Sequence, residues 1–428
     1  MAAMKAEART IRKDTLPNGL TVVSEAIPYV RSVAVGIWVE GGSRIEPAAL
    51  NGISHFIEHM VFKGTARRSV EEIARESDAL GGAVDAFTTK ESVCFSAKVL
   101  DEHLPRALDI LADLVQGPLF RDDDIKKERG VVLEEIKMDQ DNPDYLVHEL
   151  FTQTFWRDHA IGRPILGTQK TLAGFRQEVV HDFFREWYVP NHMLISAAGH
   201  LDHGRLVELV EHHFHLLKPR QNGFQDPTPV ISPRLVTRKR KELEQVHVVV
   251  GVPMHPMPHA ERYAVALLNI ILGAGMSSRL FQNIREREGL AYSIFTDLHA
   301  YRDTGCLTIY AGTSAEKISQ SVRLVLHELR RLKRELVPEE ELRRAQDNLK
   351  ASLMFTLEAT VSRMSNLARQ LSYFGRFINP DEMLASIDAV RPEQLQAVAQ
   401  EFFQPNLVGM SALGPLNNCE LHREELAD

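Results

Sequence analysis

The chain has 428 residues, of which 44% are hydrophobic and 25% are charged. This ordinary globular composition excludes a wholly disordered or collagen-like chain, and the length predicts two or three domains. The net charge of −8 provides no overall basic surface for nucleic acid or an anionic membrane. Composition therefore favours a soluble protein whose partners are neither nucleic acids nor membranes.

Three widely spaced cysteines, Cys94, Cys306 and Cys419, form no Cys-x-x-Cys pair, so neither a disulfide framework nor a cysteine-rich zinc site is expected. Residues 1–12 lack the apolar stretch of a secretory signal, although their basic residues are compatible with a short transit peptide. The longest apolar stretch, residues 264–276, is too short to span a bilayer. We therefore expect a cytoplasmic protein.

In chain order, the sequence pattern predicts strands at 19–23 and 32–39, helices at 54–62 and 70–80, a strand at 92–99 and a helix at 104–115. The second half predicts strands at 246–252 and 306–311 and a helix at 318–336. This order favours an α+β fold in which each domain has a mostly antiparallel sheet with helices packed on one face.

Two segments repeat each other at a shift of 215 residues, about half the chain. Residues 186–191 (Glu-Trp-Tyr-Val-Pro-Asn) precede an apolar run that ends at Gly199, and residues 401–406 (Glu-Phe-Phe-Gln-Pro-Asn) precede another that ends at Gly414. The repeat predicts two homologous domains. Residues 218–233 contain four prolines and are typical of a linker, which places the N-terminal domain at 1–217 and the C-terminal domain at 234–428.

The motif His55-Phe56-Ile57-Glu58-His59 indicates a metal site. On a helix, residues i and i+4 share a face, so both imidazoles can reach one ion while Glu58 can touch a bound water. Zinc with three protein ligands and one open position makes such a water acidic enough to attack a carbonyl, if a base takes its proton. A helix with two satisfied histidines and a solvated glutamate gives the same pattern, so the motif alone is only suggestive.

Candidates for the third ligand lie in the predicted helix after Asp122, which holds Glu128, Glu134 and Glu135. Glu128 and Glu135 are two turns apart and share a face, whereas Glu134 points about 100° away from Glu135. A shared face allows one carboxylate to bind the metal and the other to support it. An acidic, solvated helix face explains the same spacing equally well.

With these features the sequence resembles the pitrilysin and mitochondrial processing peptidase family, the inverzincins, as a short two-domain member of the bacterial type. The resemblance covers nearly the whole chain, and segments at 16–20, 41–46, 60–65, 162–168 and 188–191 carry it together with the motif and the duplication. It implies a zinc metalloendopeptidase with Glu58 as general base. It also implies that His55, His59 and Glu135 bind Zn2+ and that Glu128 braces the site.

The second copy has no histidine in the corresponding region, 267–280, so one zinc per chain is expected. The resemblance implies that Arg285 and Tyr292 of this copy reach the substrate, since a guanidinium and a phenol donate well to a carbonyl oxygen that gains charge. From the residues alone, a surface arginine and a core tyrosine would be the favoured interpretation.

In the resembled family the substrate adds as an extra strand to an exposed sheet edge, which corresponds here to Asp85, Ala86, Phe87 and Thr88. Asp85 stands where the family usually has Asn. An ionised carboxylate accepts hydrogen bonds but cannot donate one to a substrate, so substrate pairing at position 85 is expected to differ from that in family members with Asn.

The leading hypothesis is a zinc-dependent endopeptidase that cleaves unfolded or extended peptides in a closed chamber. The alternatives are a non-catalytic structural or assembly subunit of the same family and a presequence-specific processing peptidase. The intact set His55, Glu58, His59 and Glu135 argues against the non-catalytic subunit, because inactive members typically lose one of these residues. A two-domain chain provides half of the family's four-domain chamber, which implies a homodimer.

Overall fold

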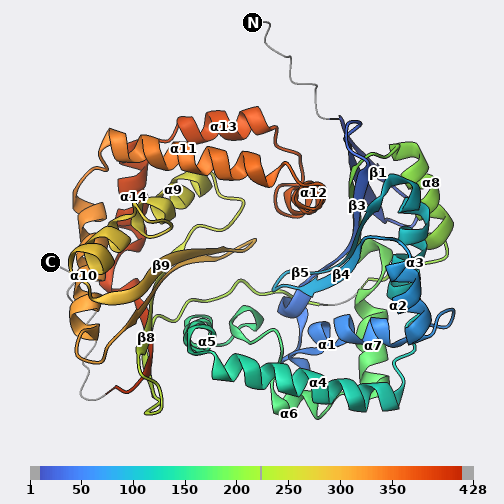
Figure 1. Ribbon diagram of the computed structural model, residues 1–428, viewed down its shortest axis with the longest axis horizontal. Helices are drawn as coiled ribbons and strands as arrows, with labels where there is room; N and C mark the ends of the chain where they lie inside the picture. The colour runs from blue at the N-terminus through green and yellow to red at the C-terminus, as the bar shows by residue number, and fades with distance from the viewer. Residues whose placement is uncertain (1–9, 222–223, 417–428) are drawn as a thin grey trace, which may run out of the picture. The chain divides into compact units, whose positions relative to one another are not determined.

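The computed structural model describes residues 10–221 and 224–416, and Figure 1 shows the arrangement of their helices and strands. Within these residues the chain forms two compact units, one drawn from 10–136, 164–221, 224–226 and 355–377 and one drawn from 137–163, 227–354 and 378–416. Each unit has its own sheet and hydrophobic core, which confirms the predicted α+β class with two domains. Within the described residues, no helix has the length and apolar character needed to cross a membrane. The cytoplasmic location stays a prediction.

The sheet of the first unit has six strands, and every neighbouring pair except β2–β6 is antiparallel. In spatial order the strands are β1 (Thr10–Thr15), β2 (Thr21–Ala26), β6 (Met193–Gly199), β3 (Ser32–Glu40), β5 (Ser92–Leu100) and β4 (Ala83–Thr88). The helices of this unit's main core include α1 (Ile53–Met60), α2 (Val70–Asp78), α3 (Leu104–Gln116), α7 (Gln177–Trp187) and α8 (His203–Phe214). Strand β4 therefore forms an open edge beside α1.

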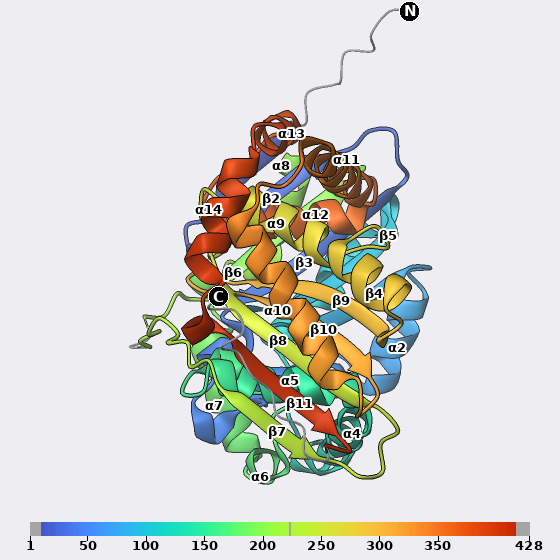
Figure 2. The ribbon, with the colours of Figure 1, turned by 90° about the vertical axis from the view of Figure 1, so that its left-hand side faces the viewer.

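The sheet of the second unit has five strands, and only β7–β11 is parallel. In spatial order they are β7 (Leu235–Lys239), β11 (Gly409–Gly414), β8 (Val246–Met254), β10 (Gly305–Thr313) and β9 (Ala291–Ala300), and Figure 2 shows α10 (Ile318–Arg334) crossing this sheet. Its other core helices include α9 (Arg262–Leu272) and α14 (Pro392–Phe402). The order matches β2, β6, β3, β5 and β4 of the first sheet, and α7 and α14 begin 215 residues apart, as an internal duplication requires.

One helix also packs on the opposite face of each sheet, in addition to the predicted layer. Helix α12 (Thr360–Phe374), from the second half of the chain, packs on β2, β3 and β6, and α5 (Pro143–Phe155), from the first half, packs on β8 and β11. Strands β6 and β8 are buried at every residue, as expected of strands covered on both faces. The compact units are therefore not the same as the sequence halves 1–217 and 234–428. Those halves describe the two homologous copies, and they stay a prediction. The remaining helices are α4 (Asp122–Asp141), α6 (Gln169–Leu172), α11 (Glu339–Thr356) and α13 (Pro380–Asp388).

Candidate metal centre and substrate site

Helix α1 begins at a backbone turn that only glycine accommodates. Gly52 has φ 95°, and an added Cβ would lie 2.7 Å from the Cα of Gly167. The buried carboxylate of Glu46 then satisfies the first amides of the helix, accepting from Gly52 N at 2.8 Å and from Ser54 N at 2.9 Å. Burial raises the pKa of Glu46 to about 7. The start of α1 is therefore fixed by contacts inside the protein.

Helix α1 has one apolar face that packs in the core and one face that carries the possible metal ligands. Its core face consists of fully buried apolar side chains, namely Ile53, Phe56, Ile57 and Met60. His55, Glu58 and His59 lie half-buried on the other face, and their ligand atoms are all within 4.8 Å of one another. Among the described residues, this is the only group of three His, Cys, Asp or Glu side chains that meets that distance.

Helix α4 brings a third side chain to these histidines. Oε2 of Glu135 lies 3.8 Å from Nε2 of His55 and 3.7 Å from Nε2 of His59. Zinc ligands at bond lengths of about 2.0–2.2 Å lie roughly 3.3–3.6 Å apart on a tetrahedron, so the distance from Glu135 to each histidine is close to that between two ligands of one zinc ion. Glu134, next along α4, is exposed.

The donor set fits a bound cation. Among the described residues, Glu135 Oε2 is buried without a hydrogen-bond partner, although it faces two imidazole nitrogens. A buried carboxylate oxygen without a partner is costly, and a metal ion relieves that cost. Burial, with a smaller effect of His59, lowers the pKa of His55 to about 4, which keeps that imidazole in the neutral form that ligates metals.

Glu128 lies behind His59. Its Oε1 is 2.8 Å from Nδ1 of His59, and its Oε2 is 2.7 Å from Nζ of Lys63. The sequence indicated Glu128, but it did not indicate Lys63, which lies four residues after His59. Glu46 was likewise not singled out, although it ends the segment 41–46 that carries part of the resemblance.

Glu58 is connected to the open sheet edge. Thr88 Oγ1, on β4, donates a hydrogen bond of 2.5 Å to Glu58 Oε2. Burial raises the pKa of Glu58, and the hydrogen bond from Thr88 partly opposes that shift. Further along β4, Oδ1 of Asp85 accepts from the backbone N–H of Ala86 at 2.9 Å. A strand that pairs with this edge through the Ala86 amide would have to displace the Asp85 carboxylate.

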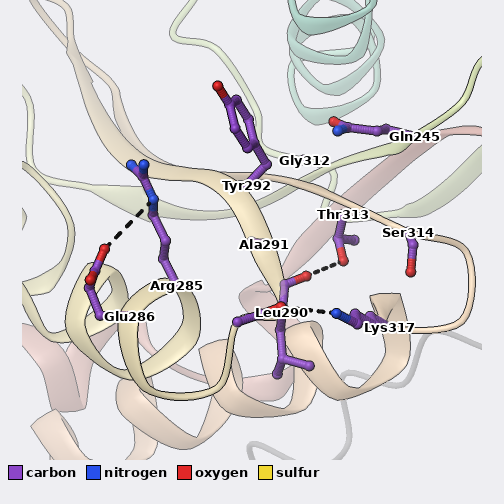
Figure 3. Close-up of a pocket in the computed structure, with 11 residues that line it drawn as sticks. Gln245, Arg285, Glu286, Leu290, Ala291, Tyr292, Gly312, Thr313, Ser314 and Lys317 are labelled. Atoms are coloured by element: carbon purple, nitrogen blue, oxygen red, sulfur yellow. Dashed lines mark hydrogen bonds and ion pairs between the residues drawn. The ribbon is translucent and has the colours of Figure 1, made fainter.

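Arg285 and Tyr292 lie together in the second unit, at a pocket of about 450 Å3 that Figure 3 shows. Arg285 follows Phe281 on a π-helical segment (Phe281–Arg287), and Tyr292 is at the start of β9. The guanidinium carbon of Arg285 is 4.7 Å from the ring centre of Phe281 and 5.9 Å from that of Tyr292. Tyr292 is 77% exposed and is therefore not the core tyrosine that the residues alone favoured.

Comparison with known proteins gives consistent matches along the chain. Residues 21–169 match the family described as Insulinase (Peptidase family M16), and residues 174–349 match the Peptidase M16 inactive domain. An uncharacterized zinc protease of Bacillus subtilis, YmxG, is 40% identical over 95% of this chain and 99% of its own. An uncharacterized zinc protease of Streptomyces coelicolor is 38% identical over 97% of this chain and 92% of its own.

Solved structures show the same fold. A protease from Helicobacter pylori has a TM-score of 0.87 at 22% identity, over 95% of this chain and 100% of that chain. A Pseudomonas fluorescens structure described as a peptidase M16 inactive domain has a TM-score of 0.89 at 18% identity, over 96% of this chain and 100% of that chain. At these identities the likeness concerns the fold alone.

Proposed function

Because the chain belongs to the M16 peptidase family, whose relatives are named zinc proteases, we propose that it is a zinc-dependent endopeptidase acting on unfolded or extended peptides. One observation carries the proposal: Nε2 of both His55 and His59 lies within 3.8 Å of Glu135 Oε2, and the ligand atoms of the same two histidines lie within 4.8 Å of that of Glu58. The likeness to the peptidase M16 inactive domain keeps a non-catalytic subunit as the second candidate, and the complete set of His55, Glu58, His59 and Glu135 argues against it.

In this proposal His55, His59 and Glu135 hold one zinc per chain. Zinc, when bound, supplies a Lewis acid that lowers the pKa of a water molecule to near neutrality. Glu58 takes the proton of the attacking water and returns it to the leaving amine. Thr88 holds the Glu58 carboxylate through its hydrogen bond, and Glu128 holds the His59 ring so that Nε2 stays available.

The substrate pairs with the open edge of β4, where backbone hydrogen bonds bind extended peptide with little demand on its sequence. Pairing at Ala86 moves the Asp85 carboxylate aside, which leaves a negative charge next to the bound peptide. Arg285 and Tyr292 donate hydrogen bonds to substrate carbonyls. We propose that they serve the zinc site of a second copy in a homodimer that encloses the substrate in a chamber.

Metal analysis combined with peptide digestion tests the function. We expect one zinc per chain and endoproteolytic cleavage of an unfolded peptide, which a chelator abolishes and added zinc restores. Mass spectrometry of the products distinguishes internal cleavage from trimming at the ends. A zinc-loaded protein that cleaves no unfolded peptide would overturn the proposal and favour the non-catalytic subunit.

A further inference from the structure

The pocket beside Arg285 and Tyr292 has a second cationic end. Figure 3 shows Arg285 and Glu286 on one side of it, and Lys317, Ser314 and Gln245 on the opposite side. Gly289, Leu290, Ala291, Gly312 and Thr313 complete the lining. The pocket thus has two positive side chains and one negative side chain, in a chain whose net charge is −8.

The second end holds hydrogen-bond donors with unused capacity. Nζ of Lys317 donates to the carbonyl oxygen of Gly289 at 3.0 Å, which uses one of its three protons. No carboxylate forms an ion pair with Lys317 among the described residues. Within residues 10–221 and 224–416, the side chains of Ser314 and Gln245 also make no hydrogen bond. A lysine without a counter-ion, flanked by a hydroxyl and a carboxamide, suits an anionic group.

A purely structural role for Lys317 would be to tie the loop at Gly289 to the start of α10. Thr313 already makes such a tie, because its Oγ1 donates to the carbonyl oxygen of Leu290 at 2.5 Å. A neutral carbonyl also requires no charged donor. Lys317 is exposed, so its charge is solvated in the free protein and is available to a ligand.

We propose that the Lys317 end of this pocket binds a carboxylate of the peptide whose carbonyl is held by Arg285 and Tyr292. The inference rests on the proposed function in taking the ligand to be a peptide. The carboxylate is either the C-terminal one or that of an acidic side chain, since both present the same two acceptor oxygens. Lys317, with Ser314 and Gln245, would thus be a specificity determinant that favours substrates with an acid beyond the Arg285 contact.

Peptide binding tests this independently of cleavage. Fluorescence anisotropy on full-length, zinc-loaded Glu58→Gln protein compares one labelled peptide as its C-terminal acid and its amide. A second pair of peptides, both with an amidated C-terminus, differs only in an internal residue that is Glu in one and Gln in the other. Mass spectrometry verifies that each peptide stays intact. We expect one acid to bind about tenfold more tightly than its neutral counterpart, as for a charge-assisted hydrogen bond, and the pair that shows this identifies the carboxylate.

Lys317→Gln should abolish the preference, because the glutamine side chain carries no charge. Its amide can still reach the carbonyl oxygen of Gly289, so the contact with the loop is retained. Lys317→Arg should keep it, and a thermal melt establishes that each variant is folded. The matched control is Lys241→Gln, an exposed lysine of the same unit that does not line the pocket. Equal binding of acid and amide in both pairs, or a preference that survives Lys317→Gln, would overturn the inference while peptide hydrolysis by the wild type still stands. Absence of hydrolysis by the wild type would refute the proposed function instead.

Discussion

Nδ1 of His59 and Oε1 of Glu128 lie 2.8 Å apart, and the second oxygen of Glu128 is neutralised by Lys63 at 2.7 Å. In this arrangement the Nδ1–H of His59 donates to the carboxylate, and the lone pair of Nε2 is directed away from it. Nε2 is the atom that lies near Glu135. The pair therefore sets both the tautomer and the ring orientation of a metal-binding histidine.

Glu128→Gln should weaken zinc affinity or activity by roughly 10–100-fold, because an amide orients the imidazole less strongly than a carboxylate. The matched control is Glu134→Gln, on the same helix but exposed, which should change little. Competition with a chromogenic chelator measures the affinity. Equal losses in the two variants would show that Glu128 has no special role.

Glu58→Gln should retain zinc and lose most of its peptide hydrolysis, by about 10²–10⁴-fold, because the general base is removed while the metal ligands remain. Glu135→Ala should instead lose the metal and, with it, the thermal stabilisation that bound zinc provides. Metal analysis and melting curves in the presence of zinc separate the two variants. Near wild-type cleavage by Glu58→Gln would exclude Glu58 as the base.

Thr88→Val should lower kcat by about tenfold, because the hydrogen bond that holds the Glu58 carboxylate is lost while the side chain keeps its shape. Thr88→Ser retains the hydroxyl and should stay close to wild type. Steady-state kinetics with one internally quenched peptide provide the comparison. A loss that appears in KM with kcat unchanged would indicate that Thr88 binds substrate and does not position the base.

Gly52→Ala should destabilise the first unit by about 3 kcal/mol or more, because the residue has φ 95° and the added Cβ would lie 2.7 Å from backbone atoms of Leu166 and Gly167. Gly81→Ala is the control, since Gly81 has φ 63° but no atom within 4 Å of the added Cβ. There only the backbone strain of about 1–2 kcal/mol remains. Urea denaturation of both variants measures the difference, and similar losses would contradict the crowding argument.

The duplication, the main strands and the helix that carries His55 and His59 follow from local periodicity and from repeated sequence, so they could be predicted from the sequence. The sequence could not predict that α5 packs on the sheet of the second unit and α12 on the sheet of the first, because an amphipathic helix does not specify which sheet it covers. The resemblance to the family, and not the spacing of the residues, selected Glu135 over Glu134 as the third metal ligand. The contacts of Thr88 with Glu58 and of Lys63 with Glu128 join segments far apart in the chain, and each is a common surface residue type without a local signal.

Arg285 and Tyr292 belong to the unit that carries no zinc motif, and in the proposed homodimer they serve the zinc site of the neighbouring copy. Arg285→Ala and Glu58→Gln homodimers should each be nearly inactive, because one lacks the carbonyl donor and the other lacks the base. Mixing them should restore activity, because a heterodimer contains one site with both groups intact. Random assortment makes about half of all dimers mixed, which gives roughly a quarter of the wild-type number of sites. Subunit exchange is verified separately with two affinity tags. If exchange occurs and no activity returns, the pair acts within its own chain or has no part in catalysis.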